Sequence, residues 1–173
     1  MSHSDEILDV VDARDCVLGQ ATRRDIHVRG LCHRAVHLFL FNPGGDLFVQ
    51  KRSATKDTFP LCYDSSASGH VDQSESYDAC VVREVQEELG LKIQFQLLRK
   101  HFQLSACAET GWEFVWVYSI QGGYVPLVNP AEIDAGAFWP PFDVTRLLSD
   151  HPDRCAPSFM RIFCEFQQRK LLP

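Results

Sequence analysis

The chain contains, at residues 69–91, the segment Gly69-His-Val-Asp-Gln-Ser-Glu-Ser-Tyr-Asp-Ala-Cys-Val-Val-Arg-Glu-Val-Gln-Glu-Glu-Leu-Gly-Leu91. Its second half predicts a helix over residues 74–90, because Ser76 is a residue type that caps helix N-termini and Gly90 stands where helices commonly end. Apolar residues recur there with the period of one helix face, at Val81, Val85 and Leu89. The segment therefore predicts a helix that packs against a core along one stripe.

Three carboxylates lie beside that apolar stripe. Glu84, Glu87 and Glu88 are spaced at i, i+3 and i+4, so they share one face of the helix. Like charges at these spacings destabilise a helix by about 0.2–0.5 kcal/mol per pair. A bound divalent cation removes this repulsion, and Mg²⁺ and Mn²⁺ prefer such oxygen ligands. Taken alone, the three residues are more typical of an ordinary solvent-exposed acidic face.

The wider spacing of the segment resembles the Nudix box, G-x5-E-x7-R-E-U-x-E-E-x-G-U, in which U is an aliphatic residue. Residues 69–91 fit it at every fixed position. The resemblance implies an α/β fold class, a Nudix-type α/β/α sandwich with a mixed β-sheet. It also implies an enzyme that uses Mg²⁺, with Mn²⁺ as a substitute, to hydrolyse the phosphoanhydride bond of a small molecule.

The flanking sequence resembles one branch of that family, the branch that contains the isopentenyl-diphosphate isomerases. The similarity lies in residues 6–12, 31–37 and 50–56 and in the Ser68-Gly-His sequence that opens the box. The isomerases carry a catalytic cysteine where this chain has Ser68, and they typically lack an acidic residue at the position of Glu84. A hydroxyl is a poor substitute for a thiol in proton transfer at carbon. We therefore expect a hydrolase, with a divergent isomerase as an alternative.

The resemblance assigns expected roles to individual residues. Glu84, Glu87 and Glu88 correspond to catalytic and metal-binding positions, and the Ser68 carbonyl and Glu113 are expected as further metal ligands, with Glu109 in reserve for Glu113. Arg52 and Lys56 match basic residues that bind the diphosphate. The expected structural positions within the box are Gly69, Glu75, Arg83 and Gly90, with an ion pair between Arg83 and Glu75.

Three histidines leave a question open. His27, His33 and His70 correspond approximately to a second metal site of the isomerases, which an acidic residue near Glu113 completes. The interval between His27 and His33 is one residue shorter than in the isomerase pattern. Ordinary hydrogen-bonded or surface histidines are therefore the competing interpretation.

The rest of the chain predicts a single α/β domain. We expect residues 1–30 to form an N-terminal extension with short strands at 7–11 and 17–21, packed on a Nudix hydrolase domain of residues 31–173. Expected strands within the domain are 35–41, 47–50, 92–104 and 112–120; residues 53–68 are expected to form a loop, and 144–149 and 158–170 helices.

The composition excludes several classes of protein. Of the 173 residues, 45% are hydrophobic and 23% charged, which is typical of globular domains and not of disordered, collagen-like or coiled-coil chains. The net charge of −6 argues against binding a nucleic-acid polymer through a basic surface. No segment has the length of a membrane helix, no signal peptide is visible, and the seven cysteines contain no C-x-x-C pair. We expect a cytoplasmic protein without a membrane partner.

The substrate is not determined by these patterns. A nucleoside diphosphate linked to another moiety is the expected substrate, and prenyl diphosphates and coenzyme A derivatives stay open. A non-catalytic diphosphate-binding Nudix domain and a regulator whose acidic helix binds a partner are further alternatives. A homodimer is expected only because most oligomers are symmetric dimers.

Overall fold

The computed structural model describes residues 5–173, so residues 1–4 of the expected extension lie outside the described part. No helix among the described residues is long and apolar enough to cross a membrane. The extension contributes β1 (Ile7–Val11), β2 (Val17–Thr22) and α1 (Arg23–Arg29). The remaining elements are β3 (His33–Phe41), β4 (Leu47–Arg52), β5 (Tyr63–Asp64), β6 (Ala67–His70), α2 (Tyr77–Leu89), β7 (Arg99–Leu104), β8 (Glu113–Gln121), β9 (Ile133–Trp139), α3 (Pro141–Asp150) and α4 (Pro157–Gln168).

The main sheet is mixed and is centred on β3. Its hydrogen-bonded order is β5-β4-β3-β8-β7, with β6 on β3 and β9 on β4; β3 and β8 run parallel. The strands β3 and β4 share only the pair Phe41 and Leu47 and then diverge. Ser66 lies in the gap, where its Oγ accepts from Leu40 N at 2.8 Å and donates to the Phe48 carbonyl at 2.5 Å. This divergence leaves room for polar side chains inside the sheet.

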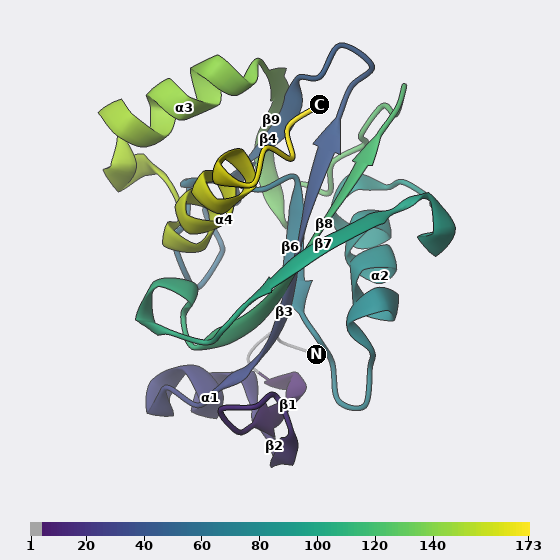
Figure 1. Ribbon diagram of the computed structural model, residues 1–173. Coiled ribbons are helices and arrows are strands. Elements are labelled where there is room, and N and C mark those ends of the chain that lie inside the picture. Colours follow the sequence, from purple (N-terminus) through teal and green to yellow (C-terminus); the bar gives the residue numbers. More distant parts are fainter. Residues whose placement is uncertain (1–4) are drawn as a thin grey trace.

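Helices cover both faces of the sheet, as Figure 1 shows: α2 on one side, α3 and α4 on the other. The alternation along β3 explains this arrangement, because successive side chains of a strand point to opposite faces. Val36, Leu38 and Leu40 pack with the apolar stripe of α2, whereas Phe39 and Phe41 pack with aromatic residues of α4. The predicted α/β/α sandwich with a mixed sheet is confirmed.

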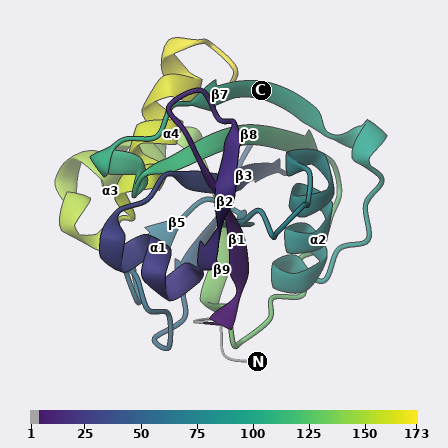
Figure 2. The ribbon, with the colours of Figure 1, turned by 90° about the horizontal axis from the view of Figure 1, so that it is seen from below.

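Figure 2 shows the β1–β2 hairpin and α1 lying against the rest of the domain. Asp15, at the turn between β1 and β2, is one point of attachment. Its carboxylate accepts from Arg34 Nε at 2.6 Å, from Tyr77 Oη at 2.8 Å and from Gln103 Nε2 at 2.9 Å. Backbone bonds from Val11 N to the Cys32 carbonyl add to this attachment. The hairpin and α1 therefore form a fixed wall of the domain; the division at residue 30 stays a prediction.

Several element predictions were wrong or incomplete. The expected strand 92–104 joins the sheet only from Arg99, because residues 95–97 form a 3₁₀ turn. The expected loop 53–68 contains β5 and the start of β6, and α3 begins at Pro141 rather than at residue 144. The strand β9 was not predicted, because its core consists of small residues. A Cβ at Gly136 would lie 2.3 Å from the Phe48 ring, so tertiary packing requires the glycine that weakens the strand signal.

Candidate active site

A cavity of about 630 Å³ opens where β3 and β4 diverge. Its wall combines α2, the loop after β4, the strand β6 and the N-terminal extension. The residues that matter below are, in chain order, Arg23, His27, Arg52, Lys56, Asp64, Ser68, Gly69, His70, Glu84, Glu87, Glu88, Glu113 and Glu132. The structure thus brings nearly all the predicted site residues to one cavity.

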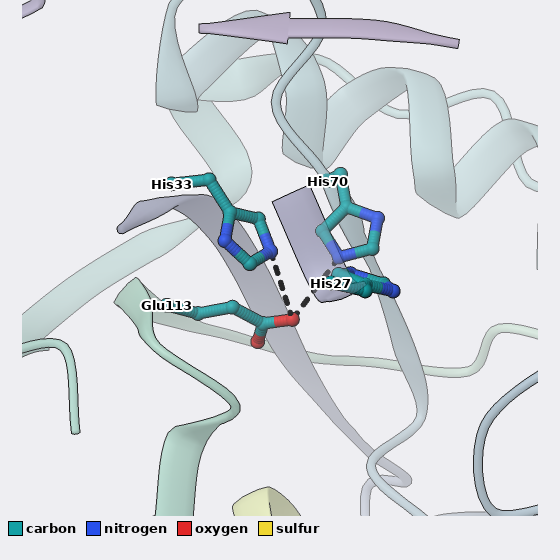
Figure 3. Close-up of side chains that lie close together, drawn as sticks. All are labelled: His27, His33, His70 and Glu113. Atoms are coloured by element: carbon teal, nitrogen blue, oxygen red, sulfur yellow. Dashed lines mark hydrogen bonds and ion pairs between the residues drawn. The ribbon is translucent and has the colours of Figure 1, made fainter. Parts of the chain in front are cut away.

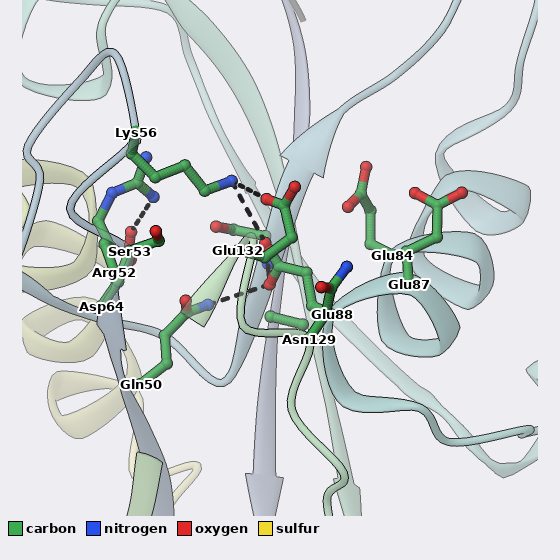
Figure 4. Close-up of polar contacts among 12 residues, drawn as sticks. Gln50, Arg52, Ser53, Lys56, Asp64, Glu84, Glu87, Glu88, Asn129 and Glu132 are labelled. Atoms are coloured by element: carbon green, nitrogen blue, oxygen red, sulfur yellow. Dashed lines mark hydrogen bonds and ion pairs between the residues drawn. The ribbon is translucent and has the colours of Figure 1, made fainter. Parts of the chain in front are cut away.

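The helix α2 presents two buried carboxylates and one exposed carboxylate to this cavity (Figure 4). Ser76 caps its N-terminus by accepting from Ala79 N, and Gly90 ends it in the left-handed conformation with φ 66°. The apolar stripe buries the opposite side, which fixes the orientation of the acidic face. Glu84 and Glu88 are 9% and 2% exposed, whereas Glu87 lies at the rim.

Glu88 is held by two neutral donors. Its Oε2 accepts from Gln50 Nε2 at 3.0 Å and from Ser68 N at 3.1 Å, and its Oε1 lies 3.9 Å from Lys56 Nζ. Burial raises the pKa of Glu88 to about 7, against the opposing effect of the Lys56 charge. A strand residue directs its N–H and carbonyl to the same side, so the Ser68 carbonyl also lies on the α2 side of β6.

Glu84 lies directly against the backbone of Gly69. A Cβ at that position would be 2.0 Å from Glu84 Oε1, so only glycine leaves space for this carboxylate. Burial and the neighbouring charge of Glu88 raise the pKa of Glu84 well above its usual value. Two buried carboxylates that repel each other are costly without a cation. The pair therefore fits a divalent metal ion such as Mg²⁺.

Arg83 forms the expected ion pair with Glu75. Its Nε and Nη2 donate to the two oxygens of Glu75 at 3.0 and 2.9 Å, and Nη2 also donates to the His70 carbonyl at 3.0 Å. Arg83 Nη1 in addition reaches Glu84 at 2.7 Å and Glu87 at 3.1 Å. Arg83 thus joins the loop before α2 to the helix and also contacts two of the acidic side chains.

The two basic residues predicted to bind phosphate already have carboxylate partners. Arg52 is 8% exposed, and its Nη1 donates to Asp64 Oδ2 at 2.9 Å. Lys56 Nζ forms an ion pair with Glu132. Both cations remain in the wall of the cavity, where a diphosphate could reach them.

The three histidines and Glu113 form a second polar cluster (Figure 3), and His27, His70 and Glu113 of this cluster line the same cavity. One ligand atom from each of His27, His33, His70 and Glu113 lies within 4.8 Å of all the others. Glu113 Oε1 is 3.0 Å from His70 Nε2 and 3.6 Å from His33 Nε2. The three histidines thus lie together with Glu113, as a metal site would require, and whether they bind a metal ion stays a prediction.

The chemistry of the cluster fits a transition-metal ion. His33 Nδ1 is 2.9 Å from the Leu31 carbonyl, which directs Nε2 toward the cluster; this buried Nε2 has no hydrogen-bond partner among the described residues. Burial lowers the pKa of His70 to about 4. Although burial opposes it, the neighbouring His33 and His70 side chains hold the pKa of Glu113 well below its usual range. Neutral imidazoles with one carboxylate are a common metal-ligand set.

Glu109, the expected alternative to Glu113, forms an ion pair with exposed Arg161 at 2.8 Å.

Sequence reasoning missed Gln50, Asp64 and Glu132. Gln50 and Asp64 point inward from β4 and β5, and no local pattern distinguishes such residues from other polar ones. Glu132 precedes β9, the strand that was not predicted. Its position beside Lys56 follows from sheet topology alone.

Comparison with known proteins agrees with this geometry. The family model described as NUDIX domain matches residues 32–159. An uncharacterized Nudix hydrolase of Streptomyces coelicolor is 42% identical over 131 residues, covering 75% of this chain and 72% of the relative. An isopentenyl-diphosphate Delta-isomerase of Photorhabdus laumondii is 28% identical over 91% of this chain and 90% of its own length.

A solved structure supports the fold in detail. The crystal structure of a Deinococcus radiodurans protein superposes with a TM-score of 0.83 and 30% identity, covering 92% of this chain and 98% of the other. The chain therefore belongs to the NUDIX domain family and is a Nudix hydrolase, an enzyme of the class that acts on acid anhydrides in phosphorus-containing compounds.

Proposed function

We propose that this enzyme is a Mg²⁺-dependent pyrophosphohydrolase that cleaves the diphosphate linkage of a small molecule. The observation that carries the proposal is the pair Glu84 and Glu88, buried together on one face of α2 in the cavity wall. Their mutual repulsion and desolvation are offset when a divalent cation binds. Mn²⁺ has similar ligand preferences and is expected to substitute.

The residues of the site would act in distinct ways. Glu84, Glu87 and Glu88 would hold the cation together with the Ser68 carbonyl. Mg²⁺, when bound, neutralises phosphate oxygens and acidifies the attacking water. One of the buried carboxylates accepts the proton of that water, and the Gln50 amide and Ser68 N–H keep Glu88 oriented.

The two basic side chains would bind the phosphate oxygens by charge-assisted hydrogen bonds. Lys56 supplies an ammonium group at the cavity wall, beside Glu132. Arg52 is fixed by Asp64, so its guanidinium is oriented before the substrate enters. Water adds to one phosphorus and the bridging oxygen leaves with the other, so the expected products are two phosphate-bearing fragments.

For the substrate, we propose a nucleoside diphosphate linked to another moiety. A cavity of about 630 Å³ has the size of typical small-molecule sites. Phe59 and Trp112 contribute half-exposed aromatic rings to its wall, and such rings can stack on a base. Prenyl diphosphates are the alternative, because the isomerase relative is named for isopentenyl diphosphate.

The test is product identification by mass spectrometry over a panel of diphosphates, with Mg²⁺ and with EDTA. The panel includes nucleotide sugars, dinucleotides, oxidised nucleotides, coenzyme A derivatives and isopentenyl diphosphate. Glu88→Gln should abolish the cleavage, while Glu165→Gln on α4, outside the residues that line the cavity, should not. Binding without turnover across the panel would support a non-catalytic diphosphate-binding domain instead.

The histidine cluster favours one second candidate, an isomerase-like activity. His27, His33, His70 and Glu113 form the kind of ligand set that the resemblance to the isomerases implied. Ser68 occupies the position of the isomerase cysteine and lacks its thiol. Deuterium incorporation into isopentenyl diphosphate in D₂O would reveal this activity. The absence of exchange, with zinc or manganese bound to the cluster, would support a metal site without isomerisation.

A further inference from the structure

The ammonium group of Lys56 lies between two carboxylates from different parts of the chain (Figure 4). It forms an ion pair with Glu132 and lies 3.9 Å from Glu88 Oε1. The three side chains are 14%, 13% and 3% exposed, respectively. Contacts in such a dry environment are stronger than on the surface. Which of the two carboxylates the Lys56 ammonium contacts therefore affects the site.

The two oxygens of Glu88 are not equivalent. Oε2 already accepts hydrogen bonds from Gln50 and Ser68, whereas Oε1 faces the Lys56 ammonium. Oε1 is thus the oxygen that a cation or the Lys56 ammonium could take. At 3.9 Å the ammonium is outside hydrogen-bond range, so it does not occupy that oxygen in this structure.

Backbone hydrogen bonds hold the Glu132 segment in place in addition to its ion pair. Asn129 N donates to the Glu88 carbonyl at 2.9 Å, and Glu132 N donates to the Asn129 carbonyl at 2.9 Å. Ser53 N, at the start of the Lys56 loop, donates to the Glu132 carbonyl at 2.9 Å. These bonds place the segment against both α2 and the loop. Substitution of the Glu132 carboxylate is therefore expected to leave these backbone bonds in place.

We propose that Glu132 is a positioning residue that holds the Lys56 ammonium away from Glu88 Oε1. This inference rests on the proposed function and assigns a residue that the sequence did not indicate. With Glu132 in place, Lys56 remains in the cavity wall for the phosphate groups, and Oε1 stays open for the cation. Without Glu132, the nearest carboxylate to Lys56 is Glu88, and the ammonium closes on it.

The proposal predicts a specific pattern of rescue in Mg²⁺ binding, measured by isothermal titration without substrate. Glu132→Gln should weaken Mg²⁺ binding about ten-fold or more, the size of a charge-assisted contact between Lys56 and Glu88. Removing the competing ammonium as well, in the double variant with Lys56→Gln, should restore the binding. If Glu132 were itself a metal ligand, the double variant would bind as weakly as Glu132→Gln, and the proposal would be overturned.

Kinetics provide an independent readout if a substrate is cleaved. Glu132→Gln and Lys56→Gln should both raise KM for the diphosphate, and the double variant should raise it no further, because both changes remove one contact. Glu132→Asp should recover part of the loss. Additive effects of the two substitutions would contradict the positioning role.

The chain offers a matched control in the neighbouring ion pair. Lys51 in β4 and Asp134 in β9 form an ion pair at 2.9 Å on the exposed face, close in the chain to Lys56 and Glu132. Asp134→Asn and Lys51→Gln should leave Mg²⁺ binding and KM unchanged. Equal losses in these controls would show that any disturbance of the strand pair is sufficient, which would overturn the proposal.

A last readout separates this proposal from the proposed function. If wild-type protein does not bind Mg²⁺, the proposed function fails, but the Lys56 ammonium can still be observed by ¹⁵N NMR in metal-free protein. The Lys56 signal is identified by its loss in Lys56→Gln. It should shift in Glu132→Gln relative to wild type. It should shift again in the double variant Glu88→Gln/Glu132→Gln relative to Glu132→Gln. An unchanged signal in Glu132→Gln would refute the positioning role.

Discussion

The contact between Gly69 and Glu84 leads to a prediction whose size follows from the structure. A Cβ at residue 69 would lie 2.0 Å from Glu84 Oε1, whereas real Cβ contacts are at 3.0 Å or more, so Gly69→Ala must move the carboxylate by about 1 Å. A misplacement of that size in a catalytic constellation costs about 10²-fold in rate. We therefore expect kcat/KM to fall about 100-fold, or about 2.7 kcal/mol in transition-state stabilisation.

Stability should change much less than activity in this variant. The clash falls on the end of a flexible side chain, which can rotate toward the cavity. The free energy of unfolding should therefore drop by less than the usual cost of overpacking, which is about 1–3 kcal/mol. The assay compares kcat/KM and urea denaturation for Gly69→Ala with those of Gly19→Ala, where a Cβ meets nothing within 4 Å. Full activity in Gly69→Ala would refute the placement of Glu84 in the site.

Three further predictions concern the pKa of Glu88, the ion pair of Glu75 with Arg83, and the residue type at position 68. Burial raises the pKa of Glu88 to about 7 from its ordinary value of 4.5. Between these two pH values the folded protein holds a proton that the unfolded chain has released. The free energy of unfolding of the metal-free protein should therefore fall as the pH rises from about 4.5 to 7. Urea denaturation in EDTA should show this slope in wild type and a flatter one in Glu88→Gln, and equal slopes would contradict it. Glu75→Ala removes both bonds to Arg83 and should lower the unfolding free energy by about 1–3 kcal/mol as well as the rate; an unchanged Tm would count against a structural role. Ser68→Cys should not create isomerase activity, which deuterium exchange into isopentenyl diphosphate would detect.

Much of the fold and part of the site followed from local patterns. The helix over residues 77–89, its cap at Ser76 and its end at Gly90 are encoded within a few residues of where they act. The ion pair of Arg83 and Glu75 could likewise be expected from the spacing of the box. Such features need no knowledge of distant segments, so a single sequence is sufficient to predict them.

The remaining features depend on tertiary contacts. His27, His33 and His70 come from three segments, and only the pairing of β3 with β6 and β8 brings two of them to Glu113. The position of Glu132 depends on β9, whose small residues gave no strand signal because Phe48 packs over Gly136. Properties set by contacts between segments far apart in the chain have no local signature, and the structure was needed to find them.

Isotope labelling shows whether the α2 carboxylates support attack of water on a diphosphate. The reaction is run with Mg²⁺ in H₂¹⁸O on the compounds of the panel, with wild type and Glu88→Gln in parallel, and the products are analysed by mass spectrometry. We expect one ¹⁸O atom in one phosphate-bearing product of wild type and none with Glu88→Gln. Label at equal rates in both proteins, or a rearranged substrate with no label, would contradict this expectation.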